Sequence, residues 1–200
     1  MVGKKTKNSN MMALLLIPVA VAINVVGAQI TNITKLPVYI DIIGTILAAC
    51  IAGPMVGITT AALSTLVNAV FRPQALPFIV TGVAIAFLVA MLSKAGMFRS
   101  VWKTAISGIL INLVSVLIST PIQIFVFGGF TGSGTSIVSA GLVATGRSLL
   151  SSLLSVGIVF GMVDKISSSL IAYCIIRNMS ERFLSKFSYG YIYLKNKEKN

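Results

Sequence analysis

The 200-residue sequence contains no histidine and only 4 acidic residues, against 16 lysines and arginines. Without histidine, a Ser-His-Asp triad, a Cys-His pair and an HExxH metalloprotease helix are all excluded. The two cysteines, Cys50 and Cys174, lie inside apolar runs, which argues against a disulfide framework. No glycine-rich loop precedes a Lys-Ser or Lys-Thr pair, so a Walker A motif for ATP is absent. We therefore expect no catalytic residue, no metal site and no cofactor bound by this chain.

Charged residues are also scarce, at 10% of the chain, whereas 56% of residues are hydrophobic and the mean hydropathy is +0.96. Several apolar runs reach the length of about 20 residues that a helix needs to cross a bilayer. A soluble domain could not cover so much apolar surface. We predict an all-α membrane protein whose single transmembrane domain, residues 11–187, lies in a lipid bilayer.

The net charge of +12 is distributed in a way that does not favour nucleic-acid binding, because it forms no single basic face. Basic residues gather in the N-terminal residues 1–10, in a central segment at residues 94–103 and toward the tail at residues 188–200. The positive-inside rule predicts that all three lie in the cytoplasm, so we expect the chain to cross the cell membrane an even number of times. We expect six crossings, with seven as the alternative, and an uncleaved first helix rather than a signal peptide.

Proline, glycine and polar residues divide the apolar sequence into predicted helices. The glycine-rich segment at residues 128–135 predicts a flexible loop on the outer side. Residues 136–162 predict a re-entrant or surface segment, or the start of a broken last helix. Asp164 and Lys165 are expected to open that last helix. The predicted six-helix transmembrane bundle comprises residues 11–29, 38–52, 55–71, 76–93, 101–127 and 163–183.

Asp41 is the most informative polar residue, since a carboxylate within the bilayer needs a partner or water. With a rise of about 1.5 Å per residue, Asp41 and Asn68 lie at nearly the same height on neighbouring helices. Arg72 lies one turn above Asn68, and Lys35 and Lys165 are further candidate partners. Asp41 therefore either faces a solute or caps the N-terminus of its helix, and the two roles are compatible.

Other polar residues extend the predicted solute site. Gln123 is expected near the outer end of its helix, two residues after Pro121. Arg147 and Lys165 could each bind an anionic group of a solute, and Asp164 lies beside Lys165. Asp41 and Asp164 are expected in unrelated surroundings, which does not favour an enzyme that uses a pair of aspartates.

The stretch DIIGTILAACIAGPMVG, at residues 41–57, resembles the Asp-x-x-Gly-Thr…Gly-Pro-x-x-Gly pattern of one group of S components of energy-coupling factor (ECF) transporters. The segments FGGFTGSGT, ATGRSLL and VDKISS resemble later parts of the same group, and the likeness covers residues 11–187. S components are the substrate-binding membrane subunits of ABC importers for vitamins. The resemblance implies a subunit that binds a vitamin or related micronutrient near the outer face and has no catalytic activity.

The resemblance also implies partners. An S component topples in the membrane when it docks to a coupling transmembrane protein, and two ATP-binding cassette ATPases use the ATP. The family's docking motif on its first helix matches Ala20, Asn24 and Ala28, with asparagine at the middle step. The predicted turn at Gly53 and Pro54 lies on the same cytoplasmic side. Small residues at this spacing also suit helix packing inside the protein, so both roles stay open.

A different class of protein is the alternative: a self-sufficient secondary transporter or a small membrane enzyme. A proton-coupled carrier should contain a carboxylate in mid-membrane and an internal repeat, and the sequence indicates neither. The identity of the solute does not follow from the sequence, because S components of different groups do not share solute contacts.

Overall fold

The computed structural model describes residues 7–194, and every regular element among them is helical. This confirms the predicted all-α class. The helices are α1 (Lys7–Thr34), α2 (Ile43–Ala52), α3 (Pro54–Phe71), α4 (Ile79–Lys94), α5 (Val101–Phe127), α6 (Gly134–Ala144), α7 (Leu149–Asn178) and α8 (Glu181–Leu184), with 3₁₀ turns η1 (Pro73–Phe78), η2 (Met97–Arg99) and η3 (Gly190–Tyr193).

Five segments in the described part of the chain are long and apolar enough to cross a membrane. Large apolar side chains such as Leu117, Phe125 and Trp102 are exposed on the outside of the bundle, as lipid contact requires. The structure is therefore that of a multi-pass membrane protein. The five segments are Met11–Thr34, Pro54–Phe71, Pro73–Lys94, Val101–Phe127 and Leu149–Asn178, while α2 and α6 are shorter, at 10 and 11 residues.

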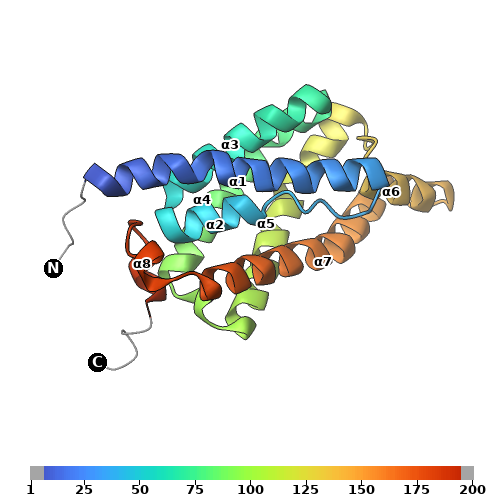
Figure 1. The fold of residues 1–200 in the computed structure, drawn as a ribbon. Helices are drawn as coiled ribbons and strands as arrows, with labels where there is room; N and C mark the ends of the chain where they lie inside the picture. The colour runs from blue at the N-terminus through green and yellow to red at the C-terminus, as the bar shows by residue number, and fades with distance from the viewer. Residues whose placement is uncertain (1–6, 195–200) are drawn as a thin grey trace.

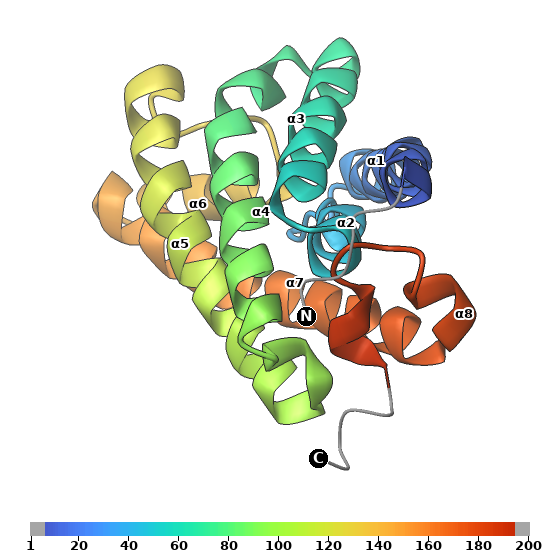
Figure 2. The ribbon, with the colours of Figure 1, turned by 90° about the vertical axis from the view of Figure 1, so that its left-hand side faces the viewer.

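The short helix α2 lies at the centre of the bundle, and all ten of its residues are buried. It packs against α1, α3, α4 and α7, and Figure 2 shows it nearly end-on among them. Close approach depends on small residues, since a Cβ at Gly44 would lie 2.0 Å from the carbonyl oxygen of Ala20. In the same way, α5 packs directly along α7, where a Cβ at Gly108 would lie 2.7 Å from the Cα of Ile166.

The chain between α1 and α2 differs from the prediction. α1 continues to Thr34, and α2 begins at Ile43 instead of residue 38, so residues 36–42 are not helical. Pro37 disfavours a helix there, and Ile40 has a positive φ of 46°. The segment lies against α1, where Gly27 leaves space for the Ile40 carbonyl and Thr31 Oγ1 donates to the Tyr39 carbonyl at 3.1 Å. These contacts replace the predicted first turn of the second helix.

The last long helix also differs from the prediction. α7 runs unbroken for 30 residues from Leu149, and its N-terminus is capped by the Ser148 side chain, which accepts from the Ser151 amide. Asp164 and Lys165 therefore lie in the middle of the last helix and do not open it. Their opposite charges pair with each other at 2.6 Å, so they need no exposed helix end. The segment predicted as re-entrant, residues 136–162, comprises most of α6, a connection at residues 145–148 and the first half of α7.

Residues 180–194, which we call the C-terminal strap, fold back onto the end of α2 (Figure 1). The Tyr189 amide donates to the Ile51 carbonyl at 3.0 Å, and the Tyr193 hydroxyl lies 2.6 Å from Ser93 Oγ. Burial raises the pKa of the Tyr193 hydroxyl, so it stays protonated in this contact. Residues 188–194 are thus part of the folded domain, not of the predicted tail. The predicted tail residues 195–200 and N-terminal residues 1–6 lie outside the described residues.

Candidate functional site

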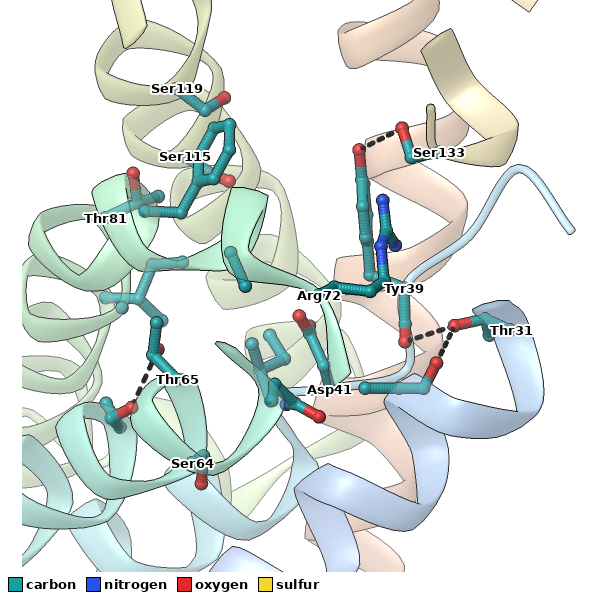
Figure 3. Close-up of a pocket in the computed structure, with 18 of the residues that line it drawn as sticks. Thr31, Tyr39, Asp41, Ser64, Thr65, Arg72, Thr81, Ser115, Ser119 and Ser133 are labelled. Carbon is teal, nitrogen blue, oxygen red and sulfur yellow. Dashed lines mark hydrogen bonds between the residues drawn. The ribbon is translucent and has the colours of Figure 1, made fainter. Parts of the chain in front are cut away.

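A cavity of about 180 Å³ lies at the end of the bundle opposite the C-terminal strap. Ten hydroxyl side chains line it, among them Thr81, Ser115 and Ser119, together with four side-chain amides. Figure 3 shows Thr81, Ser115 and Ser119 on one side of this space, with Asp41, Arg72 and Tyr39 on the other. The space therefore differs from a packing defect between apolar helices, because polar groups from several elements converge on it.

Five of the seven predicted solute-site residues line this one cavity: Asp41, Asn68, Arg72, Gln123 and Lys165. They come from the α1–α2 connection, α3, α5 and α7. Their meeting follows from packing between elements far apart in the sequence. The two other predicted residues lie elsewhere. Arg147 is exposed in the connection between α6 and α7, and Asp164 is buried directly behind Lys165.

Lys165 is the centre of a buried ionic cluster. Its Nζ lies 2.6 Å from Asp164 Oδ2 and 3.8 Å from Asp41 Oδ1. The Ile40 amide donates to the other oxygen of Asp164 at 2.9 Å, so that carboxylate is bound on both sides. The prediction that Asp41 and Asp164 have unrelated surroundings was wrong. The non-helical segment before α2 passes beside the middle of α7 and brings both carboxylates to Lys165.

Asp41 does not cap α2, so the capping alternative was wrong. The N-cap position is Ile42, which makes no side-chain cap hydrogen bond, and in the first turn the Gly44 amide donates to Asn24 Oδ1 instead of Asp41. The Asp41 side chain is 36% exposed, whereas the side chains of Lys165 and Asp164 are 6% and 0% exposed. Since Asp41 lines the cavity, its carboxylate is the most accessible acidic group of the cluster.

Arg72, at the end of α3, is held by neutral acceptors. Its guanidinium donates to Asn32 Oδ1 and, at 3.3 Å, to the Thr131 carbonyl. Within residues 7–194 it makes no ion pair. Nearby, Asn68 Oδ1 accepts from Gln29 Nε2 at 3.4 Å. Lys35, the other basic residue considered for Asp41, is exposed and does not line the cavity.

A second, smaller cavity of about 40 Å³ adjoins the first. Five residues line both cavities: Tyr39, Ser115, Ser119, Gln123 and Lys165. The Lys165 ammonium also lies 5.7 Å from the centroid of the Tyr39 ring. No group of three or more His, Cys, Asp or Glu residues in the described part of the chain could hold a metal ion.

The predicted docking residues on α1 are not on a free surface. Ala20, Asn24 and Ala28 are 1%, 0% and 8% exposed, because this face of α1 packs inside the protein. Asn24 donates to Thr45 Oγ1 and Ser64 Oγ at 2.8 and 3.0 Å and accepts from the Gly44 amide at 2.7 Å. A side chain that joins three helices in this way stabilises the bundle and is not available to contact a coupling protein.

The predicted docking turn is also covered. Gly53 is buried beneath Tyr189 of the C-terminal strap, and a Cβ at Gly53 would lie 2.6 Å from that ring. Pro54 at the start of α3 is only partly exposed. Ala20, Asn24, Ala28 and Gly53 thus lie in the packed interior of this chain, while the docking role of the partly exposed Pro54 stays a prediction.

Several cavity residues were missed from the sequence, including Tyr39, Thr81, Ser115 and Ser119. Spacing alone could have found some of them. Ser115, Ser119 and Gln123 recur every fourth residue on one face of α5. Ser64 and Asn68 do so on α3, and Arg72 follows at its C-cap. A polar stripe on an otherwise apolar helix indicates a face that turns inward. Tyr39 lies in the non-helical segment and carries no such signal.

No protein-family model matches this sequence, and no curated protein and no solved structure matches the chain. The functional interpretation therefore rests on the residues of the cavity.

Proposed function

We propose that the chain is the solute-binding membrane subunit of an ECF-type importer, which captures a vitamin or related micronutrient. The observation that carries the proposal is the polar cavity inside an apolar helical bundle. One water molecule needs about 10–15 Å³ of such space, so 180 Å³ corresponds to on the order of a dozen waters. That is room for one small organic molecule.

An unpartnered hydroxyl supports this proposal. Thr81 Oγ1 is buried and has no hydrogen-bond partner among the residues that the structure describes, and Thr81 lines the cavity. A buried polar group without a partner costs about 1–3 kcal/mol. A bound solute, or water in its absence, would supply that partner.

The six-crossing topology is part of the proposal, with α2 as the sixth crossing. Ten helical residues cover about 15 Å, and the non-helical residues 38–42 add at most about 16 Å. Together they approach the hydrocarbon thickness of about 30 Å. Non-helical backbone is tolerated at that depth where protein covers it, as α1 does. Both termini then face the cytoplasm of a prokaryotic cell, and the cavity opens toward the outside.

In this proposal the chain has no catalytic activity and binds no ATP. A coupling transmembrane protein and two ATP-binding cassette ATPases drive transport. They would engage a surface other than the buried face of α1. Reconstitution tests the proposal: vesicles that contain the chain with the coupling module should accumulate the solute when ATP is supplied. Equal uptake without the module or without ATP would contradict it.

A secondary transporter is the second candidate, because one observation favours it. Asp164, Lys165 and Asp41 form a charged cluster next to the cavity, and Asp164 is the sixteenth residue of a 30-residue helix. Carboxylates in mid-membrane are common in proton-coupled carriers. Uptake by the chain alone in liposomes under a proton gradient, abolished by Asp164→Asn, would favour the carrier over the binding subunit.

A further inference from the structure

The ionic cluster leaves one negative charge unbalanced at the cavity. Lys165 is a single cation between two carboxylates. Asp164 takes the close position at 2.6 Å, is fully buried and also accepts from the Ile40 amide. Asp41 lies 3.8 Å from the same ammonium and is the exposed member. A charge-assisted hydrogen bond normally spans about 2.7–2.9 Å, so the contact of Asp41 with Lys165 is loose.

One positive charge is unbalanced at the same cavity. Arg72 contacts an amide oxygen of Asn32 and a backbone carbonyl, and these acceptors carry no charge. In the described chain, neither acid of the cluster forms an ion pair with Arg72. Arg72, at the end of α3, and Asp41, in the segment before α2, both line the cavity and are labelled in Figure 3.

The four charged groups sum to zero, with Asp41 and Asp164 against Lys165 and Arg72. A solute with a single charge would therefore bring an uncompensated charge into a membrane-embedded site, which is unfavourable where the dielectric constant is low. A fully neutral solute would leave Arg72 without an ionic partner and Asp41 with only its loose contact to Lys165. A solute that carries one charge of each sign satisfies both groups and keeps the site neutral.

We propose that the solute is a zwitterion, with a protonated nitrogen at Asp41 and a carboxylate or other anionic group at Arg72. This inference rests on the proposed function and names its substrate class. The hydroxyls of Ser115, Ser119 and Thr81 then contact the uncharged part of the solute. Asp41 and Arg72 then select for solutes that carry both charges.

Mass spectrometry of the small molecule released when the purified protein is denatured gives the first test. A thermal-unfolding screen gives a second test. A panel of vitamins, vitamin precursors and amino acids is added to the protein, and the charges of those that raise the unfolding temperature are compared. We expect a zwitterion in both. A solute with charge of only one sign would overturn the inference and leave the proposed function intact. If no molecule is released and no compound stabilises the protein, the proposed function fails, and the inference fails with it.

A cycle of protein and solute changes assigns each charge to its partner. Acetylating the solute nitrogen should weaken binding to the wild-type protein about 10- to 100-fold, and so should Asp41→Asn. Combining the two should add little further loss, because both remove the same contact. The methyl ester of the solute should likewise lose little further affinity when it is combined with Arg72→Gln. The losses should instead add when the acetylated solute is combined with Arg72→Gln, or the methyl ester with Asp41→Asn.

Glu181→Gln and Arg182→Gln are matched controls, since both residues are exposed on α8 away from the cavity. Neither should change affinity or its dependence on the solute's charges. The measurements on the wild-type protein with the acetylated and esterified solutes need no variant, so they decide the question even if a variant fails to fold. Unchanged wild-type affinity for either derivative would overturn the proposal.

Discussion

The two ends of α2 differ sharply, although one ten-residue buried helix joins them. At its N-terminal end the neighbouring elements leave a cavity lined by hydroxyls, amides and charges. At its C-terminal end the C-terminal strap fills the space, with the Tyr189 ring on Gly53 and the Tyr193 hydroxyl on Ser93. The two ends therefore differ in packing: one contains a cavity and the other is filled. Polar side chains line an open cavity at one end, where we propose that a solute binds, and aromatic side chains on small residues close the other.

Both ends use buried hydroxyls, but for different contacts. Ser93 Oγ donates to the Cys50 carbonyl at 3.2 Å and contacts Tyr193, so it is fully engaged. Thr81 Oγ1 has no partner in the described part of the molecule. The hydrogen bonds of Ser93 contribute to folding, whereas in our proposal Thr81 gains its partner from the solute. Substitutions at the two ends should therefore separate stability from binding.

The largest expected effect follows from breaking the ionic cluster at the open end. Asp164→Ala leaves the Lys165 ammonium buried with only the distant carboxylate of Asp41. Removing one partner of a buried ion pair costs about 3–5 kcal/mol, so the free energy of unfolding in detergent should fall by about that amount. The double variant Asp164→Asn, Lys165→Met removes both charges and should recover most of the loss. Equal stability of Asp164→Ala and wild type would show that the cluster is not needed for folding.

The closed end should respond to Gly53→Val. Gly53 has a φ of 99°, and its Cβ position lies 2.6 Å from the Tyr189 ring, so valine adds backbone strain and a clash. We expect a loss of about 2–4 kcal/mol and faster proteolysis within residues 180–194. Gly141→Val is a matched control, because nothing lies within 4 Å of that Cβ position. Strap cleavage at the wild-type rate in Gly53→Val would contradict the packing described for this end.

A pair of hydroxyl deletions compares the ends directly. Ser93→Ala should lower the free energy of unfolding by about 1 kcal/mol and leave solute affinity unchanged. Thr81→Val should instead weaken solute binding about 5- to 10-fold and keep the free energy of unfolding within about 0.5 kcal/mol of wild type. Thermal unfolding and equilibrium binding measure the two quantities. If both variants change the same quantity, the ends do not differ in the way proposed.

The sequence predicted elements best where helix boundaries are local. The predicted segment 101–127 has the observed bounds of α5. The predicted start of α3, at residue 55, is one residue late, because Pro54 fits the first turn of a helix. The start of α2 could not be predicted in this way. Residues 38–42 stay non-helical because of contacts with α1 at Gly27 and Thr31, and those contacts depend on the tertiary fold.

The same limit applies to the site. Asp164 and Lys165 suggested a helix boundary, since two adjacent charges are costly inside a membrane helix. The structure balances them with each other, with Asp41 and with the Ile40 amide, and no local pattern contains that information. Asn24 was placed on a docking face for a related reason. Its spacing fits a small-residue motif, but its hydrogen bonds join α1 to α2 and α3.

If the cavity holds the solute, a side chain that fills the cavity should abolish solute binding. Gly82 on α4 lines the cavity, and a Cβ there would make only ordinary contacts, at 3.5 Å with Ala61 and 3.7 Å with Thr65. Gly82→Leu should therefore fold at least as stably as wild type, since leucine favours helix more than glycine does. Its side chain would occupy space that the solute needs.

Equilibrium binding of the released solute to Gly82→Leu, with Gly141→Leu as the exposed control, decides the matter. We expect one solute per chain in wild type and in the control, and loss of measurable binding in folded Gly82→Leu. Wild-type affinity in that variant would contradict it.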